Sequence, residues 1–339
     1  MSYKLVTESS IQDGDQEPPT LGNNETDSAS PYGFQARIAT LWILFAVGSL
    51  GNLLVFAWLC LFRRRRSRLY KIVFGISIAD MCVCIFNVLV SAILELQGTS
   101  WYAGNIVCKL VMFMQSVSLM ASSNMVVLLA VDRHQAVRNP LKKGYNLKGV
   151  IAMAWACALV FSIPQLIIWY QKETGALKTC STSFPEPVAS WKVAYITYAA
   201  VVSFLIPFVV VAIAYIRITK QIWIRASGGS MHHSIKTTTV YSNGNRMNLR
   251  VTSSALLIKA KNKTLTMSTV IILVFMACGL PYFIVEIIRL YNSGFAIDQN
   301  VYAVLGTFAV SNSAVNPYIF LVFNLGSRGR FTRDRSSTT

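Results

Sequence analysis

The segment that decides the fold covers residues 38–66 and reads IATLWILFAVGSLGNLLVFAWLCLFRRRR. Residues 38–62 contain no charged side chain, and four arginines, Arg63 to Arg66, follow directly. A helix of about 20 apolar residues spans the hydrocarbon core of a membrane. The segment therefore predicts a transmembrane helix, followed by a basic cluster that stops transfer and contacts anionic lipid at the membrane surface.

The rest of the chain repeats this apolar pattern. Of its 339 residues, 54% are hydrophobic and 13% are charged, whereas soluble domains carry about 25% charged residues. The stretches long enough to cross a membrane are residues 38–62, 70–95, 106–131, 149–170, 194–216, 265–290 and 301–323. We therefore predict an all-α membrane fold, a seven-transmembrane helix bundle over residues 37–323. A disordered tail, residues 1–36, precedes the bundle, and a cytoplasmic tail with a short helix, residues 324–339, follows it.

The charged residues orient the bundle. The formal net charge is +17, yet residues 1–36 contain one base and six acids. The loops after the first, third and fifth spans and the C-terminal tail hold 24 of the 31 lysines and arginines. Such an excess marks the cytoplasmic side, so we expect a multi-pass plasma-membrane protein with an extracellular N-terminus and a usable glycosylation sequon at Asn24. The basic charge is thus a topology signal, and nucleic acid is not an expected partner.

Polar residues inside the apolar spans point to function, because ionisable groups in a membrane are costly. Asp80 lies in the middle of the second span. Ser122 in the third span, and Asn312 and Asn316 in the seventh, supply hydroxyl and amide groups. We favour a hydrated cation site that these four residues form. A purely structural hydrogen-bond network is the alternative.

A second polar feature closes the third span at its cytoplasmic end. Asp132 and Arg133 are adjacent there, and an ion pair partly buried among helix ends acts as a latch, because breaking it exposes a charge. Pro207, Pro281 and Pro317 each interrupt a span and remove a backbone hydrogen bond. Three kinked helices beside a latch favour a bundle with two packings, which is a switch.

Two cysteines lie on the extracellular side. Cys108 stands at the outer end of the third span, and Cys180 lies in the loop between the fourth and fifth spans. Because disulfides form in the oxidising extracellular compartment, we expect a bond that tethers this loop to the third span. The other five cysteines lie in or beside spans and are interpreted as small apolar packing residues.

These residues match a family. The chain resembles the rhodopsin-like (class A) G protein-coupled receptors over residues 38–331, and it is most similar to vasopressin/oxytocin-type receptors, with gonadotropin-releasing-hormone-like receptors close behind. The motifs of the whole family are Gly51-Asn52, Ser77-Ile78-Ala79-Asp80, Cys108, Asp132-Arg133-His134, Trp155, Pro207, Tyr215, Cys278-Gly279-Leu280-Pro281 and Asn316-Pro317. Those of the sub-family are the spacing from Cys108 to Gln115, Ser162-Ile163-Pro164-Gln165-Leu166, Phe184-Pro185-Glu186-Pro187 and Asn312-Ser313-Ala314-Val315-Asn316-Pro317.

The resemblance implies a peptide hormone or neuropeptide as the agonist. The ligand-binding residues that it implies are Asn87, Ser91, Gln115, Gln165, Phe283 and Glu286. Gln115 argues against an amine ligand, because an amine receptor needs an acid there and glutamine offers only hydrogen bonds. Glu286 favours a basic group on the ligand. A local ion pair with Arg289, three residues on along the same helix, is an equal alternative.

The resemblance also implies how the switch works. Peptide binding favours outward movement of the sixth span about Pro281, so that Arg133 leaves Asp132 and meets a heterotrimeric G protein. The switch residues are Asp132, Arg133, Tyr215, Pro281, Asn316 and Pro317. Sodium at the Asp80 site favours the inactive state. Ser336 to Thr339 are candidate phosphorylation sites for receptor kinases, followed by arrestin.

Two positions depart from the family and bear on the switch. Gly279 replaces a tryptophan that is common in the sixth span, and Phe320 replaces the tyrosine of the Asn-Pro-x-x-Tyr motif. Gly279 lies beside Pro281 and is expected to make this span more flexible. We expect G protein coupling to survive with altered basal activity.

Other functions have weaker support from the sequence. One alternative is a receptor for a gonadotropin-releasing-hormone, adipokinetic or corazonin-like peptide. Another is an ion-translocating membrane protein, which Asp80 alone would suit. An enzyme is not expected, because the three histidines are all on the cytoplasmic side and form no His-Glu-x-x-His pattern. We expect no cofactor other than the sodium ion.

Overall fold

The computed structural model describes residues 31–61, 67–98, 100–138, 144–175, 177–182, 189–227, 251–292, 295 and 297–325. Three predicted features lie outside these residues: the glycosylation site at Asn24, the cluster from Arg63 to Arg66, and the C-terminal tail with its short helix and its phosphorylation sites. The first helix begins at Pro31, ahead of the boundary that the sequence predicts at residue 37.

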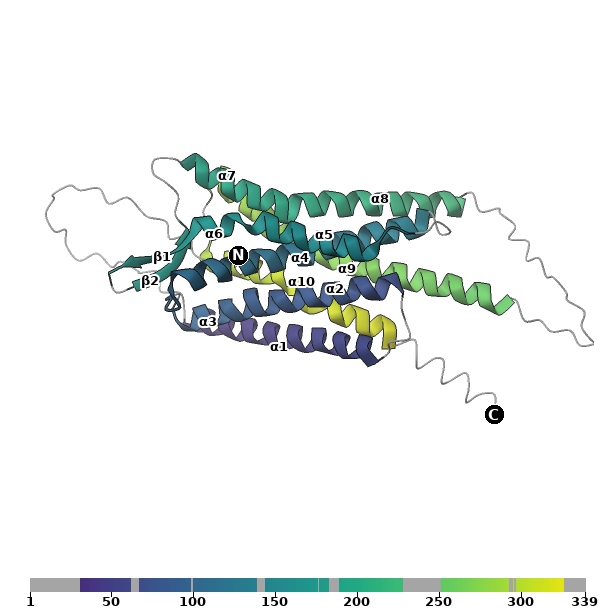
Figure 1. Ribbon diagram of the computed structural model, residues 1–339, viewed down its shortest axis with the longest axis horizontal. Coiled ribbons are helices and arrows are strands. Elements are labelled where there is room, and N and C mark those ends of the chain that lie inside the picture. The colour runs from purple at the N-terminus through teal and green to yellow at the C-terminus, as the bar shows by residue number, and fades with distance from the viewer. Residues whose placement is uncertain are drawn as a thin grey trace, which may run out of the picture.

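Seven helical rods run side by side in the described part of the chain (Figure 1). Four are single continuous helices, and three contain a short second helix or a π-helical turn. In chain order the elements are α1 (Pro31–Leu61); α2 (Arg68–Val83), the π-turn η1 (Cys84–Leu89) and α3 (Val90–Leu96); α4 (Gly104–Arg138); α5 (Leu147–Ser162) and α6 (Pro164–Ile168); α7 (Ala189–Ala200), the π-turn η2 (Val201–Leu205) and α8 (Ile206–Ser227); α9 (Val251–Tyr291); and α10 (Gln299–Leu325).

Each predicted span coincides with one of these rods, so the seven-helix prediction is confirmed. The fourth span was predicted two residues too long, because residues 169 and 170 belong to a β-strand, and residue 62 of the first span lies outside the described residues. Among the described residues, six rods are long and apolar enough to cross a membrane. The seventh is α10, whose apolar run is interrupted by Asn312, Asn316 and Asn324. Each rod extends beyond its predicted limits at one end or at both, because a helix keeps its backbone hydrogen bonds paired in water as well as in lipid.

Helix α4 lies at the centre of the bundle. It packs against α2, α5, α8 and α9, while α10 packs against α1 and α9. The largest side chains that are fully buried come from six of the rods and include Ile72, Met125, Leu129 and Phe320. Since lipid tails are as apolar as leucine, close packing of such side chains is what holds helices together in a membrane.

Small residues bring α1 close to its neighbours. A Cβ atom added at Gly48 would lie 2.7 Å from Cys84 Sγ, and one added at Gly51 would lie 2.8 Å from Pro317 Cγ. Glycine is therefore required where the α1 backbone meets η1 and α10. Close approach through small residues is typical of helix packing in membranes.

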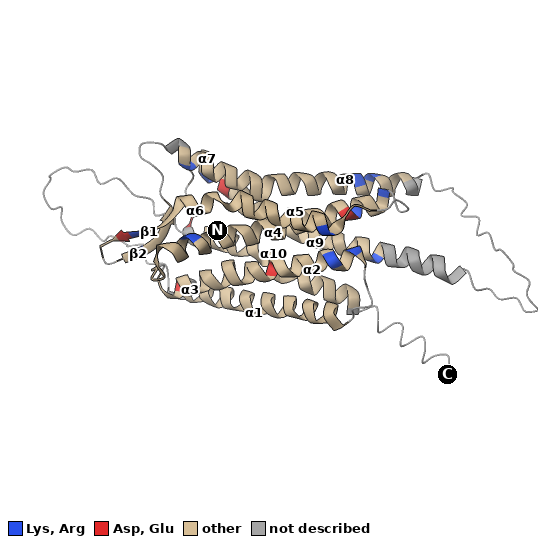
Figure 2. Cartoon of the chain, in the orientation of Figure 1, with Lys and Arg blue, Asp and Glu red and all other residues tan. Residues whose placement is uncertain are grey.

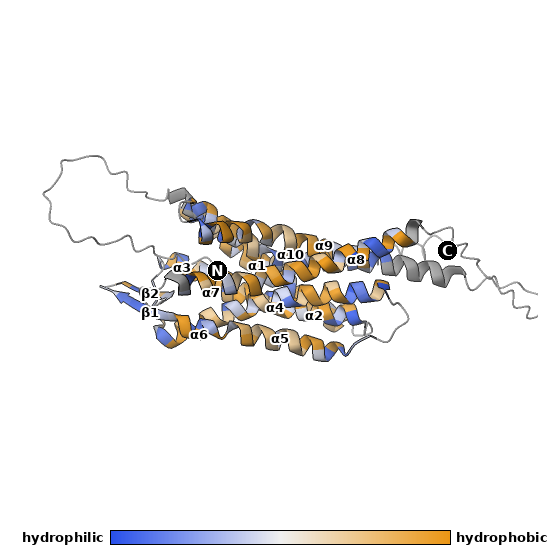
Figure 3. Ribbon diagram, turned by 90° about the horizontal axis from the view of Figure 1, so that it is seen from above, coloured by the Kyte–Doolittle hydropathy of each residue, from blue (hydrophilic) through white to orange (hydrophobic). Residues whose placement is uncertain are grey.

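Hydrophobic residues predominate along the middle of the rods (Figure 3), and many of them are exposed on the outside of the bundle. Large side chains point outward from several of the rods, among them Leu50, Met153, Leu273 and Val322, each more than half exposed. A water-soluble surface would place charges on these faces, whereas lipid accepts them. Hydrophilic residues lie mainly toward the two ends of the bundle (Figure 3).

Both π-turns lie in the middle of a rod. The turn η2, Val201–Leu205, ends directly before the stretch that holds Pro207. Proline has no N–H, so the carbonyl of Ser203 loses its regular helical partner, and a local π-turn lets the backbone adjust. Pro281 and Pro317 lie inside α9 and α10, as the sequence predicts.

A β-hairpin departs from the purely helical prediction. Strand β1 (Trp169–Thr174) pairs antiparallel with β2 (Leu177–Thr182), with Trp169 opposite Thr182. Gly175 occupies the tip with a φ of 60°, a conformation that glycine adopts at little cost. In the hairpin Lys178 donates to Glu173 at 2.8 Å, and this hydrogen bond lowers the pKa of the Glu173 carboxyl. The hairpin extends from one end of the bundle (Figure 1).

Candidate functional site

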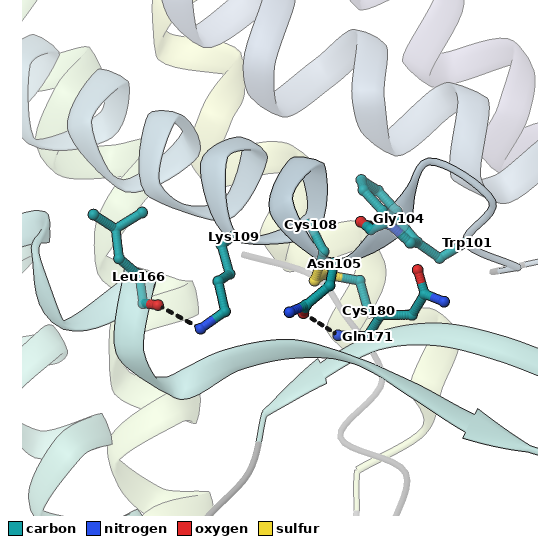
Figure 4. The surroundings of a disulfide bond; sticks show 8 residues. All are labelled: Trp101, Gly104, Asn105, Cys108, Lys109, Leu166, Gln171 and Cys180. Atoms are coloured by element: carbon teal, nitrogen blue, oxygen red, sulfur yellow. Dashed lines mark hydrogen bonds between the residues drawn. A yellow bond between two sulfur atoms is a disulfide. The ribbon is translucent and has the colours of Figure 1, made fainter.

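The predicted disulfide is present and fixes the hairpin to the bundle. Cys108 on α4 is bonded to Cys180 on β2. Two hydrogen bonds flank it in Figure 4: Lys109 Nζ donates to the carbonyl of Leu166 at 2.9 Å, and the backbone N–H of Gln171 donates to Asn105 Oδ1 at 2.9 Å. We call this the disulfide end of the bundle, and the opposite end the Asp132 end.

Three of the six predicted ligand-binding residues are buried near the disulfide end. Asn87 on η1 donates to Ser118 Oγ at 2.7 Å and to the carbonyl of Gln115 at 3.3 Å. The Oδ1 atom of Asn87 is buried and has no hydrogen-bond partner among the described residues. Gln165 on α6 lies beside Tyr195 of α7, which hydrogen-bonds to it. The structure thus brings Asn87 and Gln115 together, while Gln165 contacts Tyr195.

Phe283 and Ser91 occupy different surroundings. The Phe283 ring lies 5.9 Å from that of Phe204 and is stacked 6.5 Å from that of Phe208, measured between centroids. It therefore belongs to an aromatic cluster between α9 and the η2–α8 rod. Ser91 is half-buried on α3. Both remain predicted ligand-binding residues.

Glu286 is engaged by a residue that sequence reasoning missed. Tyr302 on α10 donates its hydroxyl to Glu286 Oε2 at 2.6 Å, and its oxygen lies 3.0 Å from the Tyr282 hydroxyl. Arg289 lies over the Tyr302 ring, 4.3 Å from its centroid. In the described residues, Glu286 and Arg289 therefore meet through Tyr302 and not as a direct ion pair. The result is a half-buried carboxylate surrounded by phenol groups.

A cavity of about 40 Å³ lies deeper in the bundle. It is lined from four rods, and its wall includes Gly279 of α9, Ser203 of η2, and Ser122 and Asn312 from the predicted cation site. A water molecule needs roughly 10–15 Å³, so the cavity is large enough to be hydrated. None of the six predicted ligand-binding residues belongs to its wall as described. A Cβ atom at Gly279 would lie 3.2 Å from the Phe208 ring.

Asp80 is fully buried in the middle of the bundle. Ser122 donates to Asp80 Oδ1 at 2.7 Å, and Asn316 Nδ2 donates to Asp80 Oδ2 at 2.9 Å. Ser313, which the sequence offered only as part of a motif, donates to Asn312 Oδ1 at 3.1 Å. The structure therefore brings three of the four predicted cation-site residues into direct contact, and Asn312 into the same cavity wall as Ser122.

Asp132 is the centre of a charged cluster at the opposite end. It is buried, and Arg133 donates to its Oδ2, so the ion pair predicted as a latch is present. Arg68 of α2 donates to its Oδ1 at 3.0 Å, and the Tyr145 hydroxyl lies 3.4 Å from the same oxygen. The Arg68 guanidinium also lies over the Tyr145 ring, 4.4 Å from its centroid. Burial raises the pKa of the Tyr145 phenol.

Two further residues complete the switch region. The Tyr215 hydroxyl on α8 is buried and has no hydrogen-bond partner in the described part of the chain. Phe320 on α10 packs edge-on against Trp58 and Tyr70, with ring centroids 5.2 Å and 5.9 Å apart. The hydroxyl that a family tyrosine would carry is thus replaced by aromatic packing between α1, α2 and α10.

Comparison with known proteins identifies the family. The model described as "7 transmembrane receptor (rhodopsin family)" matches residues 51–320. The chain belongs to this family of receptors. The neuropeptide S receptor of Mus musculus is 32% identical over 85% of this chain and 76% of that receptor. The isotocin receptor of Catostomus commersonii is 29% identical over 90% and 79%, and the mesotocin receptor of Rhinella marina is 27% identical over 85% and 74%.

Membership confirms several predictions. The chain is a multi-pass membrane receptor and not an enzyme, and the family gives no support to ion translocation. The similarity to isotocin and mesotocin receptors confirms the resemblance to oxytocin-type receptors. Similarity to neuropeptide S receptors was not anticipated from the motifs, which point to the oxytocin and gonadotropin-releasing-hormone groups.

Proposed function

We propose that the chain is a plasma-membrane receptor for a peptide hormone or neuropeptide of oxytocin-like type, and that it activates a heterotrimeric G protein. The half-buried Glu286, set among the phenol groups of Tyr282 and Tyr302 near the disulfide end, carries this proposal. The relatives named above are receptors for neuropeptide S, isotocin and mesotocin, which supports a peptide ligand.

The proposed orientation places the disulfide end outside the cell. Disulfides persist in the extracellular compartment, and most of the described lysines and arginines lie at the Asp132 end (Figure 2), which suits the cytoplasmic side. The sequon at Asn24 then lies outside and carries a glycan.

We expect removal of N-linked glycans to increase the gel mobility of the wild-type receptor. The Asn24→Gln variant should already run at the faster position, and an unshifted wild type would count against this orientation or the use of the sequon.

The groups near the disulfide end suit a basic side chain or terminal amine of the peptide. Tyr302 donates one hydrogen bond to Glu286 Oε2, and because a carboxylate can accept several hydrogen bonds, a donor group of the ligand can also bind it. Tyr282 and Tyr302 present aromatic rings around it, and aromatic faces attract cations as well. Gln115 and Asn87 offer neutral hydrogen bonds to the peptide backbone.

We expect the Glu286→Gln variant to respond about 10–100-fold less strongly to a basic peptide agonist. A hydrogen bond to a charged group contributes about 1.5–3 kcal/mol, and about 1.4 kcal/mol corresponds to a tenfold change in affinity. The agonist is first identified by screening amidated neuropeptides, vasopressin-like peptides included, with calcium and cAMP readouts. Concentration–response curves then compare the variant with wild type for the agonist and for an analogue whose basic group is neutral.

Glu173→Gln is the matched control, because it removes the same charge from the exposed hairpin, where Glu173 pairs with Lys178. It should leave the potency unchanged. Equal losses in the two variants, or an equal loss for the neutral analogue, would show that Glu286 does not recognise a basic group. The absence of a response to every peptide in the presence of surface receptor would contradict the proposed function itself.

The proposed signalling step uses residues of the Asp132 end. Peptide binding favours a packing in which α9 moves outward and Arg133 leaves Asp132, as population shift between two arrangements requires. The buried, unpartnered hydroxyl of Tyr215 is a hydrogen-bond group available to that released arginine. Receptor kinases and arrestin would act on Ser336 to Thr339, and basic residues near the membrane surface would contact anionic lipid.

The residues around Asp80 fit a sodium ion. The donors are a carboxylate, hydroxyls and amide oxygens, which are the ligands that hard cations prefer. Asn316 Oδ1 is buried and has no partner in the described residues, and the adjoining cavity has room for water. Asp80, Ser122, Asn312 and Asn316 would hold the ion, whose positive charge would neutralise the carboxylate within the membrane. The chain's own hydrogen bonds from Ser122 and Asn316 orient that carboxylate.

A further inference from the structure

A second pocket opens at the Asp132 end, between α4 and α8. Its volume is about 410 Å³, within the range of about 300–1,000 Å³ that is usual for small-molecule sites. Neither the latch nor the predicted ligand-binding residues contribute to its wall. The residues that line it are His134, Arg138, Arg217, Lys220, Gln221 and Ile224. We call it the α4–α8 pocket.

Helical spacing builds the pocket from two facing stripes. His134 and Arg138 are four residues apart on α4. On α8, Lys220 and Gln221 follow Arg217 by three and four residues, so they share one face of that helix. The two helices pack against each other. Two basic faces therefore meet at a point where helix packing alone would favour apolar or oppositely charged pairs.

The described residues supply no counter-charge to this pocket. Of their acidic residues, Asp132 lies nearest along the chain, and its carboxylate is engaged by Arg68 and Arg133. Arg138, Arg217 and Lys220 take part in no ion pair among the described residues. Like charges held close together repel one another, and a bound anion relieves that repulsion.

The rim of the pocket is apolar. Ile224 lines the pocket and is 54% exposed, and Trp223 and Ile216, which lie on the same helix outside the pocket wall, are 69% and 66% exposed. Exposed tryptophan is typical of the boundary between membrane and water. An anion that binds here thus has apolar side chains beside it, as the acyl chains of a lipid require. A soluble acidic partner would gain nothing from this rim.

We propose that the α4–α8 pocket binds the phosphorylated headgroup of an anionic membrane lipid, of the phosphoinositide class. Arg217 and Arg138 would hold phosphate oxygens by paired hydrogen bonds, and Lys220 would add a point charge. Basic pockets between transmembrane helices on the cytoplasmic side are suited to such headgroups. The proposal rests on the orientation given above, which places this pocket in the cytoplasmic leaflet. A lipid bound here bridges α4, which carries Arg133, and α8, which carries Tyr215.

The test measures lipid binding to the purified full-length receptor and needs neither the peptide nor a G protein. Native mass spectrometry counts adducts of short-chain phosphatidylinositol bisphosphate over a concentration series. We expect the double variant Arg217→Gln with Lys220→Gln to weaken binding by roughly tenfold or more, given the contribution of each basic residue near a membrane surface. The single variant Arg138→Gln tests the pocket independently from the α4 side, and thermal unfolding without lipid shows that each variant is folded.

The matched control is the double variant Lys71→Gln with Lys148→Gln, which removes two exposed charges from the same end of the bundle but outside the pocket. It should bind the lipid as the wild type does. Equal weakening in control and pocket variants would indicate a diffuse surface effect and overturn the proposal, as would unchanged binding in both pocket variants.

Further binding measurements distinguish a lipid headgroup from a soluble phosphate as the ligand. Short-chain phosphatidylserine should bind more weakly than the bisphosphate lipid, because it offers fewer phosphate charges. Inositol trisphosphate and inorganic phosphate should compete only weakly, because they lack acyl chains to meet the apolar rim. Competition by either at the affinity of the lipid would make a soluble phosphate the ligand and overturn the lipid assignment. Pocket variants that lose G protein activation but keep lipid binding would assign the pocket to the protein partner instead.

Discussion

Replacement of Asp132 by asparagine is expected to raise agonist-independent G protein activation by roughly tenfold or more. The Asp132 carboxylate is buried and holds both Arg133 and Arg68. Loss of one partner of a buried ion pair costs about 3–5 kcal/mol. If about 1.4 kcal/mol of this cost destabilises the inactive arrangement and not the active one, the ratio of active to inactive receptor rises tenfold. Nucleotide exchange on a purified G protein, measured in receptor membranes without peptide and scaled to surface receptor number, gives the result.

Arg68→Gln is the informative comparison. It removes the 3.0 Å contact to Asp132 Oδ1 but leaves Arg133 on Oδ2, so basal activation should rise less than in Asp132→Asn. An unchanged basal rate in Asp132→Asn, at normal surface level, would show that the ion pair does not hold the inactive arrangement. Equal rises in the two variants would show that Arg68 and not Arg133 is the partner that matters.

Arg68 illustrates what sequence reasoning could not reach. The sequence places it next to Arg63–Arg66, where it counts as one more base of the topology signal. The latch between Asp132 and Arg133 was predictable because the two residues are adjacent. Arg68 begins α2 and Tyr145 lies just before α5, and only the packing of these two segments against α4 brings both residues to the same carboxylate.

Glu286 shows the same limit at the disulfide end. Helical spacing offers Arg289 as its local partner, and this alternative is equal in weight to a ligand contact when only the sequence is known. The structure brings in Tyr302 from the following helix, which donates to Glu286 and lies under Arg289. Transmembrane spans can be predicted from apolar runs, because a segment inside the membrane must be apolar over its whole length. Side-chain partners on different helices depend on how each helix is rotated about its axis and how deep each residue lies in the membrane, and hydropathy does not encode either property.

The role of Gly279 could be predicted only in part from the sequence. The sequence marks it as a missing tryptophan and predicts a more flexible sixth span. The structure adds that Gly279 lines a cavity that extends to Ser122 and Asn312, with the Phe208 ring in close approach. The absence of a large side chain thus leaves space beside the predicted cation site, which no pattern in the sequence indicates. The predicted effect on flexibility stays a prediction.

Replacement of Asp80 by asparagine is expected to abolish the effect of sodium on peptide binding. In the wild type, sodium should lower agonist affinity by about 5–150-fold, the usual range of coupling between two sites. The asparagine keeps the size of the side chain and still accepts a hydrogen bond from Ser122, but it lacks the charge that attracts a cation inside the membrane. The measurement is peptide competition binding in sodium chloride and in choline chloride at equal ionic strength.

Asp298→Asn controls for loss of charge, because Asp298 is exposed at the start of α10, far along the helix from Asn312 and Asn316. This variant should keep the full difference between sodium and choline. A sodium-specific shift that persists in Asp80→Asn would move the cation site elsewhere. A wild type that binds peptide equally in both salts would leave the Ser122–Asp80–Asn316 contacts as a structural network, the alternative that the sequence already offered.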